Sequence, residues 1–181
     1  MADDRGPVTV RPARTSDVWT IRSLVDNYTA DRLLLSKATV TLFEDVPDFV
    51  VAETPNTPET PETAEHSVVG CAAVHVLWED LAEVRTLAVD PAYRGAGVGR
   101  ALLDAVLARA VDLGVQRLFC LTFAVDFFAG AGFVPIGEEK VVGPGVYDQL
   151  LQSYDEGVAE FLDLERVKPN TLGNTRMLRH L

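Results

Sequence analysis

The chain has few cysteines and lacks a long hydrophobic run, and both features narrow what it can be. Its two cysteines, Cys71 and Cys120, stand far apart inside apolar stretches, without a CxxC or Cys/His spacing. We therefore expect small buried side chains in a reducing compartment, and no metal site. The N-terminus carries acids where a secretory signal has positive charge, and no apolar stretch is long enough to span a membrane. These features predict a cytoplasmic protein.

Basic residues are scarce as well. Sixteen Lys and Arg stand against 27 Asp and Glu, which gives a net charge of −11. This balance argues against general binding to nucleic acids or to anionic membranes. At 181 residues, 48% of them hydrophobic, the chain is expected to form a single domain over 1–181 with a sizeable core. A local site for an anion remains compatible with this composition.

The hydrophobic patterning predicts an α/β fold with a sheet of mixed, mostly antiparallel strands flanked by helices. Strands are expected at 8–11, 48–53, 67–78, 82–89 and 116–122, with a last strand near the C-terminus. Helices are expected from a cap at Thr15 or Ser16 to about Tyr28, then at roughly 37–44, at 97–113 and at about 147–164. The segment 124–137 is expected to hold a short helix, a glycine turn and a strand. The Pro/Thr/Glu-rich segment 54–66 is predicted to be a flexible loop, and 144–181 to hold a C-terminal helix and the closing strand.

The most informative stretch is "VDPAYRGAGVGRALL" at 89–103. Gly95, Gly97 and Gly99 alternate there, framed by Arg94 and Arg100, directly before an apolar helical run. Unpaired N–H groups and a partial positive charge at a helix N-terminus favour an anion, and glycines let it approach the backbone. The spacing is neither that of a Walker A loop nor that of a Rossmann fingerprint.

These residues resemble the Q/R-x-x-G-x-G/A motif of the GNAT superfamily of acetyl-CoA-dependent N-acetyltransferases, and "FFAGAGFVPIG" resembles a later element of that family. The resemblance implies acetyl-CoA as co-substrate, with its pyrophosphate on the amides of the loop and its pantetheine arm along a strand end. The implied cofactor-binding residues are Leu87, Ala88, Val89, Arg94, Gly95, Ala96, Gly97, Val98, Gly99, Arg100 and Phe128.

The chemistry of acetyl transfer needs a base for the amine. Many GNAT enzymes carry a glutamate where this chain has Glu83, six residues before Val89 and so, by alternation, on the same side of the strand. Many relatives also have a tyrosine acid where this chain has Phe128. Two options remain open for the thiolate: it leaves without a proton donor, or it takes a proton from Thr122, Tyr93 or water. His75 is either a core or a cleft residue.

Several segments resemble the acetyltransferase domain of N-acetylglutamate synthases: "LLLSKATVTLFEDVPDFVVAE", "VVGCAAVHVLWEDLAEVRTLAVDPAYRG", "RLFCLTFAVDFFAGAGF" and "NTRML". The amino-acid-kinase-like domain usual in those enzymes is absent from this sequence. The resemblance implies an amino-acid acceptor, whose carboxylates need basic or hydrogen-bonding partners. The implied substrate-binding residues are Lys37, Arg85, Asn174, Thr175 and Arg176.

The leading hypothesis is therefore an enzyme that acetylates the α-amine of L-glutamate or L-glutamine, the first step of arginine biosynthesis. Two alternatives stay open. One is a GNAT enzyme for another amine, such as a polyamine, an aminoglycoside or a protein N-terminus. The other is a non-catalytic acyl-CoA-binding sensor. The expected partners are small molecules, and a homodimer is left open.

Overall fold

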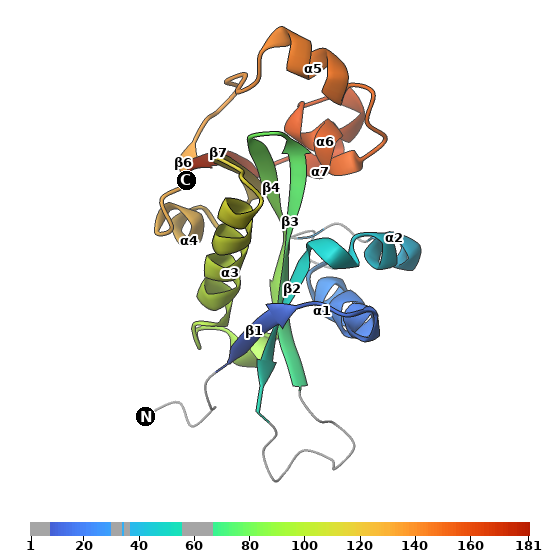
Figure 1. Ribbon diagram of the computed structural model, residues 1–181, viewed down its shortest axis with the longest axis vertical. Helices are drawn as coiled ribbons and strands as arrows, with labels where there is room; N and C mark the ends of the chain where they lie inside the picture. Colours follow the sequence, from blue (N-terminus) through green and yellow to red (C-terminus); the bar gives the residue numbers. More distant parts are fainter. Residues whose placement is uncertain (1–7, 30–33, 35–36, 56–66) are drawn as a thin grey trace. The chain divides into compact units, whose positions relative to one another are not determined.

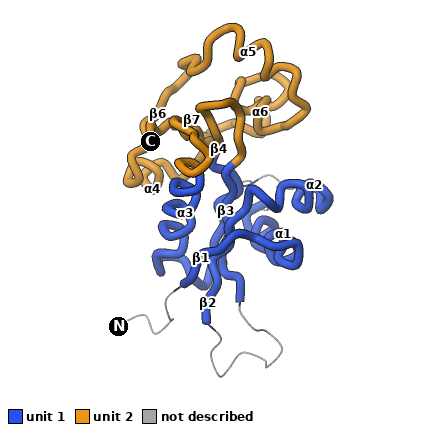
Figure 2. Tube along the Cα trace, viewed as in Figure 1, with its two compact units in different colours: residues 1–74, 84–109 blue, residues 75–83, 110–181 orange. Residues whose placement is uncertain are grey.

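The computed structural model describes residues 8–29, 34, 37–55 and 67–181. They form two compact units, shown in Figure 2. Unit 1 holds 1–74 and 84–109, and unit 2 holds 75–83 and 110–181. Seven strands follow the order β1-β2-β3-β4-β5-β7-β6. Two of them, β3 (Ser67–Trp78) and β4 (Leu81–Val89), contribute residues to both units. The predicted loop lies outside the described residues over 56–66, while Thr54 closes a strand.

Unit 1 contains the N-terminal strands of the sheet (Figure 1). β1 (Thr9–Pro12) pairs antiparallel with β2 (Phe49–Thr54), and β2 pairs antiparallel with β3. The register between β2 and β3 shifts between Ala52 and Glu53. The two faces of β2 are almost wholly buried, which explains its nearly continuous apolar sequence.

The helices of unit 1 cover both faces of these strands (Figure 1). α1 (Val18–Thr29) and α2 (Thr39–Glu44) pack apolar side chains with β2 and β3 in one core cluster. On the other face, α3 (Val98–Asp112) approaches β3 so closely that a Cβ added to Gly70 would lie 2.9 Å from Leu102 Cδ1. The predicted helices are confirmed here, although α2 begins at Thr39 rather than at 37.

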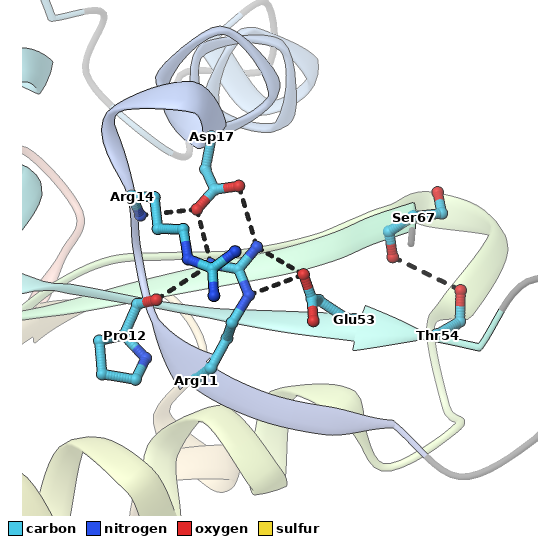
Figure 3. Close-up of polar contacts among 7 residues, drawn as sticks. All are labelled: Arg11, Pro12, Arg14, Asp17, Glu53, Thr54 and Ser67. Atoms are coloured by element: carbon cyan, nitrogen blue, oxygen red, sulfur yellow. Dashed lines mark hydrogen bonds and ion pairs between the residues drawn. The ribbon is translucent and has the colours of Figure 1, made fainter. Parts of the chain in front are cut away.

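The predicted cap of α1 is wrong, because neither Thr15 nor Ser16 caps the helix. A 3-10 turn (Thr15–Asp17) precedes the helix, and the Asp17 carboxylate accepts from the Arg14 N–H at 2.7 Å. The same carboxylate receives two hydrogen bonds from Arg11, whose guanidinium also contacts Glu53 on β2 (Figure 3). This ionic network holds the pKa of Asp17 below its ordinary value, chiefly through the Arg11 hydrogen bonds.

Unit 2 carries the C-terminal strands. Leu81–Glu83 of β4 run parallel to the start of β5 (Arg117–Thr122), and β5 pairs antiparallel with β7 (Thr175–His180). The short β6 (Val134–Pro135) follows α4 (Val125–Ala129) and pairs with β7. The predicted helix, glycine turn and strand after 124 and the closing strand are confirmed.

The predicted helix over 147–164 is wrong, because two helices occupy that region. α5 (Pro144–Leu150) ends before 151, and α6 (Glu156–Phe161) begins after Asp155, whose side chain accepts from the Val158 N–H at 2.9 Å. This cap starts a new helix where the apolar spacing alone suggested continuity. A short α7 (Lys168–Thr171) follows.

Both helices α5 and α6 pack onto one face of the unit 2 strands. Leu150 from α5 and Phe161 from α6 join Leu81, Phe119 and Leu178 in a single core cluster. The Phe119 and Phe161 rings meet edge to face at 5.0 Å between centroids. This contact helps to hold α6 on that face of the sheet.

The two cysteines are buried and free, as the apolar runs predicted. Burial raises the pKa of the Cys71 thiol to about 12 and also raises that of Cys120. Among the described residues, no helix is both long and apolar enough to cross a membrane.

Candidate active site

The glycine-rich loop between β4 and α3 adopts a conformation that requires two of its three glycines. Gly95 and Gly97 have φ values of 80° and 81°, and a Cβ added at either would meet nothing within 4 Å. Backbone conformation, and not crowding, therefore selects glycine at these positions. Gly99 lies in the first turn of α3. The loop leads directly into a helix N-terminus, as the motif predicted.

Arg94 at the start of this loop contacts Tyr28 of α1. The Tyr28 hydroxyl donates to the Val89 carbonyl oxygen, and Arg94 Nε donates to that hydroxyl at 3.3 Å. Arg94 Cζ also lies 5.1 Å from the centroid of the Tyr28 ring. The sequence pattern indicated Tyr28 only as part of the apolar face of α1. Its contacts with Val89 and Arg94 could not be predicted, because these residues are far from Tyr28 in the sequence.

β4 buries charged side chains in both units. In unit 2 Glu83 is 4% exposed, which excludes a surface glutamate, and in unit 1 Arg85 is 8% exposed. Thr86 has a φ of 53°, in the left-handed region that strand residues do not normally adopt. Side-chain alternation therefore cannot be counted across Thr86. The inference from spacing that Glu83 and Val89 share a side of the strand is not supported by this backbone.

Unit 2 gathers two predicted site residues on one face of its strands. Glu83 lies opposite Phe119 in the parallel pair, and Phe119 lies opposite Leu178 in the antiparallel pair. Arg176 precedes Leu178 by two residues and Glu83 follows Leu81 by two, so each shares the face of its neighbour. Since Leu81, Phe119 and Leu178 belong to one cluster, Glu83 and Arg176 face the side on which α5 and α6 pack.

Arg176 is fixed by several contacts within unit 2. Its two Nη groups donate to the carbonyl oxygens of Gly137 and Phe161, each at 2.9 Å, and its Cζ lies 5.6 Å from the Phe119 ring centroid. Its Nε is buried without a hydrogen-bond partner among the described residues. Burial lowers the pKa of Arg176, partly offset by Asp163. The guanidinium is thus held through both Nη groups, and its Nε–H is unused within the described residues.

A cavity of about 250 Å³ opens beside Arg176 in unit 2. Residues of the segment after β6, of α5 and of the turn after α6 line it together with Arg176; among them are Glu138, Lys140, Tyr147, Phe161 and Asp163. Sequence reasoning missed every lining residue except Arg176, because the loop after β6 carries no motif. The space is large enough for a small polar molecule.

Lys37 in unit 1 forms an ion pair with Asp45. Its Nζ lies 3.1 Å from Asp45 Oδ2, and both side chains are mostly buried. Its carbonyl oxygen accepts from Arg22, which also donates to Thr39 Oγ1 at 2.7 Å. A ligand carboxylate at Lys37 would therefore compete with Asp45.

The other predicted residues of unit 2 have structural contacts. Asn174 donates to the Asn170 carbonyl oxygen at 3.4 Å, and Thr175 lies opposite Thr122 on β5. Thr122 Oγ1 accepts from the Ala124 N–H at 2.9 Å. Phe128 is buried and packs edge to face on Phe133, at 5.2 Å between ring centroids.

Two further candidates lie outside these groups. His75 Nε2 stands 4.0 Å from Asp155 Oδ2 in unit 2, and Tyr93 ends a 3-10 turn in unit 1. Over the ranges that the structure describes, no three His, Cys, Asp or Glu side chains are gathered as a metal site would need.

Sequence comparison identifies the class. The model of the acetyltransferase (GNAT) family matches residues 29–133. A protein of Mycobacterium tuberculosis named amino-acid acetyltransferase is 54% identical over 169 residues, which cover 93% of this chain and 92% of that protein. The chain belongs to the GNAT acetyltransferase family.

Solved structures agree with the fold. The crystal structure of Rv2747 from M. tuberculosis, in complex with CoA and NLQ, is 53% identical with a TM-score of 0.85, over 96% of this chain and 99% of that one. An N-acetylglutamate synthase from Neisseria gonorrhoeae, complexed with coenzyme A and N-acetyl-glutamate, is 22% identical with a TM-score of 0.72. It matches 98% of this chain but only 36% of its own, and supports the fold alone.

Proposed function

We propose that this protein is an amino-acid N-acetyltransferase that transfers acetyl from acetyl-CoA to the α-amine of L-glutamate or L-glutamine. The observation that carries the proposal is the placement of a buried carboxylate, Glu83, and a fixed guanidinium, Arg176, on one face of unit 2. An amino acid brings both an amine to be deprotonated and a carboxylate to be bound, so it suits such a pair. The 54% identical relative named amino-acid acetyltransferase supports the same assignment.

The co-substrate is assigned to the loop of unit 1. The amides of 94–100, at the N-terminus of the fifteen-residue helix α3, would receive the pyrophosphate of CoA, with Arg94 adding charge. The pantetheine arm would run along Leu87–Val89, whose N–H groups would polarise the thioester carbonyl. Phe128 would contribute an apolar contact, since its ring offers no proton.

In the proposed reaction, the Glu83 carboxylate takes a proton from the ammonium group of the amino acid, directly or through water. The amine nitrogen attacks the thioester carbon and forms the new C–N bond. The C–S bond then breaks and the thiolate leaves as CoA, which takes up a proton.

The carboxylates of the acceptor would be recognised by basic groups. Arg176 lines the cavity of unit 2, and Lys37 and Arg85 are further candidates in unit 1. Charge-assisted hydrogen bonds of this kind are shorter and stronger than neutral ones. Asn174 and Thr175 would add polar contacts beside Arg176.

A screen of acceptors tests the proposal. Thiol release from acetyl-CoA is measured with each of the twenty amino acids, with several polyamines and with an aminoglycoside. We expect turnover with glutamate or glutamine well above the rate without acceptor. Turnover confined to a polyamine or aminoglycoside would contradict the proposed substrate, and CoA binding without transfer to any amine would identify a sensor instead.

A further inference from the structure

The Tyr28 hydroxyl joins the two ends of the turn that connects β4 to the glycine loop. It donates to the carbonyl oxygen of Val89, the last residue of β4, and accepts from Nε of Arg94, five residues further on. The Arg94 guanidinium also lies against the Tyr28 ring, with Cζ 5.1 Å from its centroid. A phenol can donate one hydrogen bond and accept others, so both contacts are compatible.

The turn between these two residues is closed by its own hydrogen bonds. The Asp90 side chain accepts from the Ala92 N–H, and the Asp90 carbonyl accepts from the Tyr93 N–H, both at 2.8 Å. The Asp90 N–H in turn donates to the Val69 carbonyl oxygen on β3 at 2.8 Å. These hydrogen bonds fix the backbone of the turn. The orientation of the Arg94 side chain depends on other contacts.

Tyr28 sets that orientation. With Nε engaged by the hydroxyl and the guanidinium resting on the ring, the plane of the group is defined. The two Nη groups, which make no hydrogen bond or ion pair with the part of the chain described, then remain as donors for an anion. A guanidinium ordered in advance loses less conformational freedom when it binds than one that moves freely.

We propose that Tyr28 is a positioning residue for CoA binding, which holds Arg94 ready for the pyrophosphate. This inference rests on the proposed placement of CoA at 94–100. Tyr28 also packs its ring against the core of unit 1, so its truncation would disturb folding. The change Tyr28→Phe keeps the ring and removes only the hydroxyl, which separates positioning from packing.

The experiment measures the dissociation constant of CoA by calorimetry for the wild type, Tyr28→Phe, Arg94→Ala and the double variant. Pantetheine, which lacks the pyrophosphate, is the comparison ligand. Tyr154→Phe is the matched control, because it deletes the same hydroxyl from a fully exposed tyrosine. Thermal melts verify that each variant is folded. Direct binding needs no acceptor, so the result does not depend on which amine is acetylated.

We expect Tyr28→Phe to weaken CoA binding about 2- to 10-fold, the effect of one hydrogen bond. It should leave pantetheine binding unchanged and have little further effect in the Arg94→Ala background. Equal CoA affinity in Tyr28→Phe and wild type, additive effects of the two changes, or equal weakening of pantetheine would each overturn the inference. An unchanged affinity in Arg94→Ala would instead refute the placement of CoA on the loop. If the variants change CoA affinity as expected but the wild type transfers acetyl to no amino acid, the proposed function is refuted and the positioning role of Tyr28 stands.

Discussion

Glu83 lies directly opposite Phe119 in the parallel pair of β4 and β5, and Phe119 carries the Arg176 guanidinium over its ring. A buried phenylalanine thus connects a carboxylate and a cation that are 93 positions apart in the sequence. The proposed function gives these two charged groups separate roles, and each role can be tested by substitution.

The role of Glu83 as base predicts a large loss of rate on removal of its charge. Glu83→Gln keeps the shape of the side chain but cannot accept the proton, so kcat should fall about 10²- to 10⁴-fold. The measurement is steady-state thiol release with the best acceptor of the screen. Glu79→Gln, in the exposed turn before β4, is the control and should retain full activity. An unchanged kcat in Glu83→Gln at neutral pH would remove Glu83 from this role.

The two backbone hydrogen bonds of the Arg176 guanidinium predict that lysine cannot replace it. Arg176→Lys retains a charge but loses the two bonds to backbone carbonyls, so it should raise KM for the amino acid about tenfold or more and lower the free energy of unfolding by about 1–3 kcal/mol. Arg179→Lys is the control on the same strand, since Arg179 donates to the Ala131 carbonyl oxygen at 2.5 Å. It should lose stability without any change in KM. If both variants raise KM equally, the effect of Arg176 is structural.

The pairing of Lys37 with Asp45 predicts opposite effects of two substitutions. Lys37→Ala should raise KM for the amino acid and leave KM for acetyl-CoA nearly unaltered. Asp45→Asn removes the competing carboxylate and should lower the same KM about 2- to 5-fold. Both are read from initial rates with one substrate varied at a time. A rise in KM for both substrates would mean that Lys37 supports the fold and not the acceptor.

The network around Asp17 predicts a specific acid sensitivity. Its folded-state pKa is depressed, so its contribution to stability is fully present above the unfolded value of about 3.9 and is lost as pH falls through the folded pKa. Asp17→Asn should therefore be less stable than wild type by about 1–3 kcal/mol at pH 7. The difference should shrink as the pH is lowered below about 4.

Urea unfolding between pH 2 and 7 measures this difference. Glu156→Gln is the control, because Glu156 pairs with Arg166 in an exposed position, where ion pairs contribute little. A gap between wild type and Asp17→Asn that stays constant across the pH range would contradict the assigned role of the charge.

Local signals in the sequence were sufficient for much of the fold. Glycines at 95, 97 and 114, each with a φ near 80°, and the apolar spacing between them define α3 from neighbouring residues alone. The break between α5 and α6 escaped prediction, because it depends on whether Asp155 caps a new helix or simply occupies a helical position. Apolar periodicity does not distinguish these two cases.

The candidate site was predictable only in part, for a related reason. Glu83 and Arg176 were found by their resemblance to family motifs, but their common sheet face follows from strand register, which no single segment encodes. Tyr28 matched an apolar helix face, and its partners at 89 and 94 lie some sixty residues away. Asp45 carries no motif, and its neutralisation of Lys37 depends on the turn that follows α2.

The left-handed backbone of Thr86 separates the stretch of β4 that carries Glu83 from the stretch that leads to the glycine loop. A β-branched residue pays for this conformation in free energy, so a glycine at 86 would relieve the strain while loosening the strand. On the proposed assignment, substitutions before Thr86 would change the surroundings of Glu83, and those after it would change the stretch proposed to hold the pantetheine arm. If this assignment holds, acceptor preference and binding of the acetyl donor can be changed separately within one strand.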